Sequence, residues 1–205
     1  MIDDGMQERV YFAMHAPDRP AEDVARDMDR KPEDVLAFFG INRGMTVLDL
    51  MAGTGYYTEL LSAAVGPEGS VYSHNDMMAL RMRHGAIQKA MDRRLARNRL
   101  PNTRLWTREI TSLGLQEEVD VATLILNLHD LYIFGGEQRV VDALENIRVA
   151  LKPGGILGVV DHAGIRDYNN NHLHRIDPDI ARELIIKAGF SIVNWSSTLA
   201  NFEDN

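Results

Sequence analysis

Two glycines, Gly53 and Gly55, stand one residue apart directly after a short apolar run that begins at Met45. An acid, Asp49, lies inside that run, and the residues from Tyr56 onward have the composition of a helix. Glycine permits a sharp turn and lets a ligand approach the backbone closely, because it has no Cβ. The free N–H groups at the start of a helix can then face that ligand. The stretch predicts a strand, a turn and a helix of the kind that binds nucleotide-like cofactors. The alternative is an ordinary strand-to-helix turn.

A second group of reactive side chains consists of two histidine–aspartate pairs, His129 with Asp130 and His162 with Asp161. Each pair follows an apolar run, so both are expected at strand ends of one sheet. Unperturbed imidazole has a pKa of about 6.5, which suits the removal of a proton from a phenol, an acid or an amine. We predict His129 as the first candidate for such a base and His162 as the second, with Asp130 beside them.

The same pairs have two other interpretations. Together with the amide of Asn127 they offer ligands to a divalent metal ion, which would orient and acidify a hydroxyl substrate. They can also do no more than form hydrogen bonds at strand ends. A His-x-His sequence, His172 and His174, lies in a polar segment at 166–177 that could fold over the site. It can be a metal-binding pair, but a solvated loop is the preferred interpretation.

The elements that must position these residues alternate between strand and helix. Helices are expected at 20–39 with an interruption at Lys31–Pro32, and at 56–65, 80–98, 137–151 and 178–188. Strands are expected at 45–50, 70–75, 103–108, 119–126, 156–160 and 190–195. This alternation predicts right-handed crossovers and an α/β fold with a doubly wound, mostly parallel sheet. In such a sheet, ligands bind at the carboxyl ends of the strands.

The composition limits the class of protein. A chain of 205 residues with 45% hydrophobic residues has room for one domain with a sizeable core. Its net charge of −8 argues against a general nucleic-acid binder, and no apolar run is long enough to cross a bilayer. The sequence has no cysteine, which excludes disulfides and thiolate metal sites, and its acidic start at Met1–Gly5 lacks the pattern of a signal peptide. A cytoplasmic protein without a membrane partner is expected.

A glycine at position 58 would complete the dinucleotide-binding fingerprint, but the residue there is Thr58. The stretch instead resembles the first motif of class I S-adenosylmethionine-dependent methyltransferases, in which an acid that ends the strand precedes x-G-x-G-x-G. Met51 stands where that motif usually has its first glycine. The resemblance implies S-adenosylmethionine as the cofactor. The implied cofactor-binding residues in this stretch are Asp49, Met51, Gly53, Thr54, Gly55 and Tyr56.

Later strand ends extend the resemblance. The second strand ends at Asn75, where the family usually has an acid that binds the ribose hydroxyls, and Asp76 is the competing candidate. After the third strand, Glu109 is implied to meet the exocyclic amine of adenine and Ile110 to lie against the ring. Asn127 ends the fourth strand and completes the implied cofactor-binding set.

The match runs from about Met45 to Asp161 and includes the turn Lys152–Gly155, which recurs in the superfamily. More narrowly, the chain is similar to a poorly characterised group of predicted methyltransferases, through the stretches at 30–32, 127–132, 160–162 and 173–177. The resemblance implies one methyltransferase-like domain over 1–205, with an N-terminal helical lid at 1–42 and a Rossmann-like core at 43–205. The last, antiparallel strand of the family is missing from the expected elements.

The implied function is methylation of a small molecule at an oxygen or a nitrogen. A histidine base is expected to activate the acceptor, and a divalent metal ion is the alternative. Two other functions stay open. Asn75, Met51 and the missing last strand suggest a protein that binds S-adenosylmethionine without turnover. The basic segment from Arg81 to Arg108 suggests an RNA methyltransferase, but the acidic overall charge and the absence of an appended RNA-binding module argue against a nucleic-acid partner.

Overall fold

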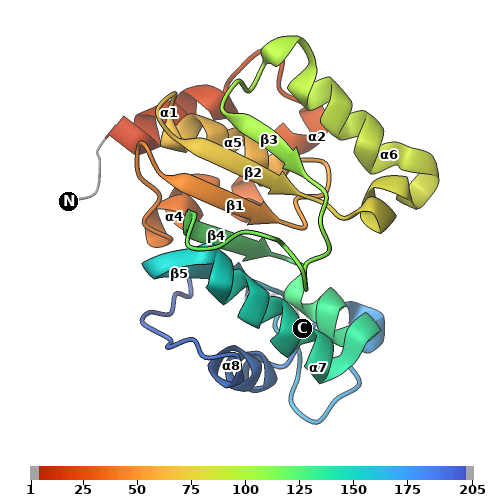
Figure 1. Cartoon of the computed structure of the whole chain (residues 1–205). Helices are drawn as coiled ribbons and strands as arrows, with labels where there is room; N and C mark the ends of the chain where they lie inside the picture. The colour runs from red at the N-terminus through yellow and green to blue at the C-terminus, as the bar shows by residue number, and fades with distance from the viewer. Residues whose placement is uncertain (1–4, 202–205) are drawn as a thin grey trace.

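The computed structural model describes residues 5–201, so the start of the chain at 1–4 lies outside the described range. At its centre is a five-stranded sheet in which all neighbouring strands run parallel (Figure 1). The order across the sheet is β3-β2-β1-β4-β5, with β1 at Thr46–Leu50, β2 at Ser70–His74, β3 at Thr103–Trp106, β4 at Val119–Ile125 and β5 at Leu151–Val160. The predicted α/β, doubly wound fold is confirmed, and the described part of the sheet is wholly parallel.

Helices cover both faces of this sheet, and the side chains of β1 alternate between them. Val47 belongs to one hydrophobic core, with α1, α4 and α5. Leu48 and Leu50 belong to a second core on the opposite face, with α7 and α8. The bounds of these helices are α1 Gly5–Met14, α4 Pro32–Phe38, α5 Tyr56–Val65, α7 Leu128–Ala150 and α8 Pro178–Lys187. The alternation places Asp49 on the face that α5 covers.

The N-terminal segment forms part of the first core. α1, which the sequence patterns did not predict, packs on α5 and buries Met6 and Val10. Two short helices follow, α2 (Ala21–Val24) and α3 (Asp27–Arg30), and the predicted interruption at Lys31–Pro32 is present, with Pro32 as the first residue of α4. α1 and α4 are therefore a packed layer, and the lid function of 1–42 stays a prediction.

The predicted sixth strand at 190–195 is wrong. Among the described residues this segment pairs with no strand, and Val193 and Trp195 are 79% and 64% exposed. β-Branched and aromatic residues favour a strand only where packing and a neighbouring strand support them. Here Phe190 packs against the core beside α8, and the chain after it stays at the surface. β5 is consequently an edge strand of the described sheet.

Two helices begin earlier than the sequence predicted. α7 starts at Leu128 and is interrupted at Gly136, where φ is +71°. α6 (Met77–Leu95) starts at the cap residue Asp76, whose carboxylate accepts a hydrogen bond from the Ala79 N–H at 2.7 Å. As a result, the residues that follow β4 lie in the first turn of a helix rather than in an open loop.

A close contact joins α4 to β5. A Cβ placed on Gly158 would lie 2.6 Å from ring atoms of Phe39, which is nearer than real Cβ atoms approach other groups. Phe39 is buried in the core of the α5 face. Gly158 therefore provides the space in which this aromatic ring lies against β5.

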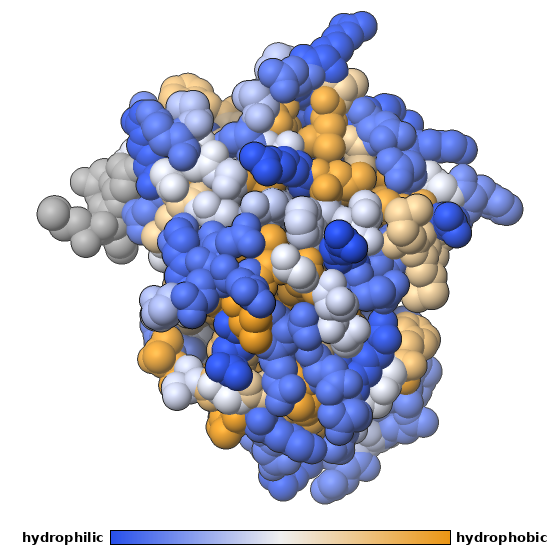
Figure 2. Space-filling model, in the orientation of Figure 1, coloured by the Kyte–Doolittle hydropathy of each residue, from blue (hydrophilic) through white to orange (hydrophobic). Residues whose placement is uncertain are grey.

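The face of the molecule shown in Figure 2 is mostly hydrophilic, and its hydrophobic side chains form small, separate groups. Within residues 5–201, no helix is both long enough and apolar enough to cross a membrane.

Candidate functional site

Asp49 lies near the end of β1, and its side chain is almost fully buried. One carboxylate oxygen accepts a hydrogen bond from Thr58 Oγ1 at 2.6 Å and the other accepts one from Thr123 Oγ1 at 3.2 Å. Since Thr58 gives its only hydroxyl proton to Asp49, Ser73 must be the donor in the 2.9 Å bond between Thr58 and Ser73. Burial raises the pKa of Asp49 to about 6, although the two hydroxyl bonds act to lower it. A cationic ligand nearby would stabilise the ionised form.

The two glycines after β1 have different surroundings. Gly53 has a φ of +57°, and a Cβ placed on it would meet nothing within 4 Å. Gly55 has a φ of +85°, and a Cβ there would lie 2.8 Å from Cδ of Arg94 and 2.9 Å from Sδ of Met91. Packing therefore requires glycine at position 55, whereas Gly53 borders open space in which a ligand can approach the backbone.

Side chains at the end of β2 hold this turn in place. Asn75 accepts a hydrogen bond from the Gly53 N–H at 2.9 Å and donates one to the Gly53 carbonyl oxygen at 3.0 Å. His74 Nδ1 accepts the Met51 N–H at 3.2 Å, which leaves His74 Nε2 to donate to the carbonyl oxygen of Arg108 at 2.8 Å. Burial lowers the pKa of His74, in keeping with this neutral form. The ribose contact of Asn75 stays a prediction, because both of its polar atoms already bind Gly53.

Met51 has a φ of +50°, a backbone conformation that costs a non-glycine residue roughly 1 kcal/mol. Its carbonyl oxygen accepts a hydrogen bond from Asn127 Nδ2 at 3.3 Å, and its side chain packs against the core of the α7 face. The positive φ gives a physical reason why glycine is usual at this position of the motif. In this chain, the hydrophobic packing of Met51 offsets the strain.

A cavity of about 210 Å³ opens at the carboxyl ends of β1 and β4. This is where the strand order reverses, because β2 and β3 lie on one side of β1 and β4 lies on the other. The sequence-predicted cofactor residues in its wall are Asp49, Met51, Gly53, Thr54, Tyr56 and Asn127. The wall also contains Arg26, Arg30 and Tyr57, which the sequence patterns did not assign to a site.

Other predicted cofactor residues lie away from this wall. Asp76 caps α6 through the bond to Ala79. Glu109 is exposed, with one carboxylate oxygen 3.9 Å from Nη2 of Arg139. Ile110 is buried in the core of the α7 face. Their contacts with ribose and adenine stay predictions.

Arg30, the last residue of α3, brings a positive charge to the cavity. Its guanidinium carbon lies 4.5 Å from the ring centroid of Tyr56 and 5.8 Å from that of Tyr57. Burial, followed by the neighbouring charge of Arg26, lowers the pKa of Arg30. Arg26 is paired with Asp23, whereas the guanidinium of Arg30 has no ion pair or hydrogen bond with any residue in 5–201. An anionic group in the cavity would compensate this charge.

Buried ion pairs attach α6 and the N-terminal segment to α5. Arg94, which is 6% exposed, donates hydrogen bonds to Asp23, to Glu59 and, at 2.8 Å, to the carbonyl oxygen of Thr54. Arg99 also pairs with Glu59. Two arginines of the basic segment thus pair with acids of the protein itself, which weakens the nucleic-acid interpretation of that segment.

Beyond β5, Asp161 holds His129. The Asp161 carboxylate accepts hydrogen bonds from the His129 ring at Nδ1, from the His129 backbone N–H at 2.8 Å and from the His162 backbone N–H at 2.8 Å. The two histidine rings lie with their centroids 6.0 Å apart, so the two pairs seen in the sequence do meet. Burial lowers the pKa of His129, but the Asp161 bond and the charges of Asp161 and Asp130 outweigh it and raise the pKa overall.

A larger cavity, of about 440 Å³, lies beside the end of β5. Its wall combines the aromatic side chains of Phe38 and Trp195 with the polar groups of Asp161 and His162. His129 is only 4% exposed and is part of neither cavity wall, whereas His162 is exposed. Of the two histidines predicted as bases, His162 is therefore the better placed to meet a small molecule.

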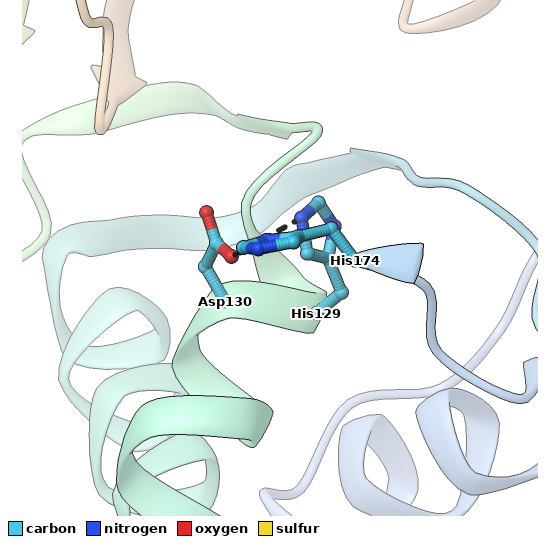
Figure 3. A group of neighbouring side chains, drawn as sticks. All are labelled: His129, Asp130 and His174. Atoms are coloured by element: carbon cyan, nitrogen blue, oxygen red, sulfur yellow. Dashed lines mark hydrogen bonds and ion pairs between the residues drawn. The ribbon is translucent and has the colours of Figure 1, made fainter. Parts of the chain in front are cut away.

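The loop before α8 reaches the same region. Nδ1 of His174 lies 2.8 Å from Oδ1 of Asp130, and the His174 ring stands edge-on to His129 with centroids 5.6 Å apart (Figure 3). His172 is exposed and lies beside Tyr168 instead. One histidine of the His-x-His sequence thus joins the site, and the other does not.

Two residues near the site, Arg30 and His74, had no assigned role from sequence, and a third, His174, was expected in a solvated loop. Arg30 belongs to a stretch that carried the family resemblance, but no local pattern indicates that a short helix places it beside the glycine turn. His74 ends β2 and bonds a turn that lies 23 residues earlier. His174 was noted only as a possible metal ligand, since a polar loop alone does not reveal where it folds.

No protein-family model matches this sequence, and no curated protein sequence matches it. The fold is similar to that of a SAM-dependent methyltransferase from Aquifex aeolicus, with a TM-score of 0.69 and 23% identity over 88% of each chain. It is also similar to an arsenic(III) S-adenosylmethionine methyltransferase from Chlamydomonas reinhardtii, with a TM-score of 0.60 and 21% identity over 88% of this chain and 61% of that one.

A SAM-dependent O-methyltransferase from Thermotoga maritima matches with a TM-score of 0.54 and 15% identity, over 87% of this chain and 54% of that one. This chain thus spans less than two thirds of the length of the second and third structures. At these identities the likeness establishes the fold, which is the Rossmann-like fold of class I methyltransferases.

Proposed function

We propose that this chain is an S-adenosylmethionine-dependent methyltransferase that binds its cofactor in the 210 Å³ cavity and methylates a small molecule at an oxygen or a nitrogen. The observation that carries the proposal is the glycine turn at Gly53. A Cβ on Gly53 would meet open space, Asn75 fixes the Gly53 backbone, and the buried acid Asp49 and the cation of Arg30 line the same cavity. The surrounding fold is that of class I methyltransferases.

The charges around the cavity suit the amino-acid end of the cofactor, which carries a carboxylate, an ammonium group and a sulfonium. The Arg30 guanidinium can bind a carboxylate through two parallel hydrogen bonds. Asp49 supplies a negative charge that a nearby cationic group would stabilise. We therefore place the cofactor carboxylate toward α3 and the rest of the amino-acid end across the turn at Gly53.

We place the acceptor in the 440 Å³ cavity, because the walls of the two cavities are in direct contact. Leu126 in the wall of the smaller cavity donates its N–H to the carbonyl oxygen of Val160 in the wall of the larger one, at 2.7 Å. The apolar and aromatic walls suit a small organic molecule, and Asp161 and His162 provide its polar contacts.

When bound, S-adenosylmethionine supplies a methyl group that an oxygen or nitrogen lone pair attacks while the bond from carbon to sulfur breaks. The chain's chief contribution is to hold the cofactor and the acceptor in line in the two cavities, which lowers the activation free energy of methyl transfer by several kcal/mol. An acceptor that arrives protonated must also lose a proton, and a ring nitrogen of His162 is the group in the larger cavity that can take it.

Calorimetric titration with S-adenosylhomocysteine and, separately, with NADH tests the cofactor. We expect saturable binding of S-adenosylhomocysteine alone. Arg30→Gln should weaken it by tenfold or more, about 1.4 kcal/mol, because the carboxylate loses its charged partner. The control Arg104→Gln removes an exposed arginine of β3 and should keep wild-type affinity. Binding of NADH instead, or equal losses in the two variants, would reject the proposed cofactor site.

Turnover needs its own test, since a protein that binds the cofactor without turnover remains the rival function. Phenolic, carboxylic and amine acceptors should be assayed with methyl-labelled cofactor. We expect transfer to one of these classes, reduced roughly 10²–10⁴-fold in His162→Gln at unchanged affinity for S-adenosylhomocysteine. Cofactor binding with no transfer to any acceptor would favour the binding protein, and transfer to RNA alone would favour the nucleic-acid alternative.

A further inference from the structure

Three potential metal ligands converge outside both cavities. His129, Asp130 and His174 each offer one ligand atom, and these three atoms lie within 4.8 Å of one another. Oδ1 of Asp130 lies 3.3 Å from Nε2 of His129 and 2.8 Å from Nδ1 of His174. His129 and Asp130 come from the first turn of α7 and His174 comes from the loop that precedes α8, so the fold joins two segments that are distant in sequence. Figure 3 shows the three side chains pointing toward one another.

The hydrogen bonds around His129 determine which of its atoms faces this cluster. Its Nδ1 bonds the Asp161 carboxylate, which can only accept, so that nitrogen carries the proton. In a neutral imidazole Nε2 is then a lone-pair acceptor, and it faces Oδ1 of Asp130 at 3.3 Å. Two acceptors that face each other at this distance repel unless a proton on Nε2 or a metal ion lies between them.

Asp161 orients the His129 ring for such a site through hydrogen bonds. It accepts hydrogen bonds from the ring and the backbone N–H of His129 and from the backbone N–H of His162. A carboxylate that bonds the second ring nitrogen of a histidine fixes its tautomer and orients the other nitrogen toward a metal. Because its two oxygens already accept three bonds, Asp161 serves as this support rather than as a ligand.

We propose that His129, Asp130 and His174 bind a divalent transition-metal ion of the zinc type and that this ion fastens the loop at 162–177 to the start of α7. Two imidazole nitrogens and one carboxylate are a ligand set that zinc accepts, with further positions for water. The side chain of His174 is 55% exposed, so one side of the site is open to solvent. The loop carries His162 and Arg175, which line the 440 Å³ cavity, so the ion would also fix one wall of that cavity.

The test uses the full-length chain after dialysis against EDTA, titrated with ZnCl₂ by calorimetry and with CoCl₂ by visible absorption. We expect one equivalent of either metal to bind, with cobalt giving the ligand-field bands of a low-coordinate nitrogen and oxygen site. His174→Asn keeps a residue that tolerates the positive φ at this position, and it should lower zinc affinity at least tenfold, as should Asp130→Asn. Asp161→Asn should lower it roughly 10–100-fold through the support of His129.

His172→Asn is the matched control, because it makes the same change in the same loop at a histidine outside the cluster. It should bind zinc as the wild type does. Absence of saturable binding in the wild type, or equal losses in His172→Asn and His174→Asn, would overturn the site and leave Asp130 as a simple hydrogen-bond acceptor. The site is independent of the proposed cofactor cavity, so affinity for S-adenosylhomocysteine should be the same in His174→Asn and the wild type.

Discussion

The carboxyl edge of the sheet is built in two different ways. Around β1 and β2 the polar side chains are buried and bond one another or the backbone, as Asn75 does with Gly53 and Asp49 does with two threonines. Around β5 one part of the cavity wall is an exposed histidine, His162, and a largely exposed tryptophan, Trp195, both on segments without regular structure. The first region is organised before any ligand binds, which lowers the entropic cost of binding, whereas the second can adapt to its ligand.

The largest effect is expected at the centre of the rigid region. Arg94→Ala would leave Asp23 and Glu59 as buried carboxylates without this partner, at a cost of about 3–5 kcal/mol in the free energy of unfolding. For a domain of this size that corresponds to a fall in Tm of about 10 °C, measurable by calorimetry. Arg93→Ala, an exposed neighbour on the same helix, should change stability by no more than about 0.5 kcal/mol. Equal effects at 93 and 94 would mean that the ion pairs do not organise the region.

The two glycines of the turn separate stability from binding. Gly55→Ala should destabilise the chain by about 1–3 kcal/mol, because its Cβ collides with Arg94 and Met91. Gly53→Asn should keep stability within about 1 kcal/mol, since asparagine tolerates positive φ, but should weaken S-adenosylhomocysteine binding tenfold or more by filling the open space.

Gly114→Asn is the control, because Gly114 has a φ of +71°, no group within 4 Å of its Cβ position and no place in either cavity wall. It should bind the ligand normally. Normal binding in Gly53→Asn as well would contradict the role given to Gly53.

The buried carboxyl group of Asp49 should make the free energy of unfolding depend on pH. The pKa of Asp49 is about 6 in the folded chain and about 3.9 when unfolded, so folding favours its protonated form. This contribution to stability is fully present below pH 4 and is lost as the pH rises through 6. Asp49→Asn should therefore be more stable than the wild type at pH 7, by up to about 2 kcal/mol, and the difference should shrink toward pH 4.

Denaturant titrations at a series of pH values measure this difference. The same variant should bind S-adenosylmethionine less tightly at pH 7, because the cavity no longer has the negative charge of Asp49 near the cationic cofactor. A variant that is less stable at every pH would show that the hydrogen bonds of Asp49, rather than its charge, decide its contribution.

The smallest effect is expected in the adaptable region. Trp195 is 64% exposed, and its ring lies 5.4 Å from the guanidinium carbon of Arg182. Loss of that exposed contact in Trp195→Ala should lower the free energy of unfolding by only about 0.5–1 kcal/mol, as measured by denaturant titration. A loss as large as that of Arg94→Ala would show that the tail after α8 is part of the rigid framework and would remove the contrast between the two regions.

The sequence predicted the parallel sheet because its signals are local. Apolar runs followed by glycine or polar residues mark buried strands wherever helices alternate with them, and five of the six expected strands are present. The failure at 190–195 has the same origin, because a run of β-branched residues cannot show whether a sheet edge is within reach. The whole of α1 was missed, because this helix is stabilised by packing on α5 rather than by a strong amphipathic pattern.

The residues of the candidate site also divide into those that local sequence signals predict and those that depend on contacts distant in sequence. Asp49 lies near the end of β1, and Gly53 and Asn127 follow strand ends, so the fold alone brings them to one cavity. Arg30 and His174 come from a short helix and a loop, and their positions depend on contacts distant in sequence that no local pattern encodes. The sequence predicted His129 as the first base candidate and His162 as the second. The burial of His129 in the helix that begins at Leu128, which no local pattern encodes, favours the opposite order.

The contact between Phe39 and Gly158 constrains how this chain can change over evolutionary time. Any side chain added at position 158 meets the aromatic ring, so the substitution is harmful as long as the phenylalanine is present. A smaller residue at position 39 would first leave a gap, which a later side chain at 158 could fill. The order of the two substitutions is therefore fixed, and among descendants of this chain a side chain at 158 should be found only together with a reduced one at 39.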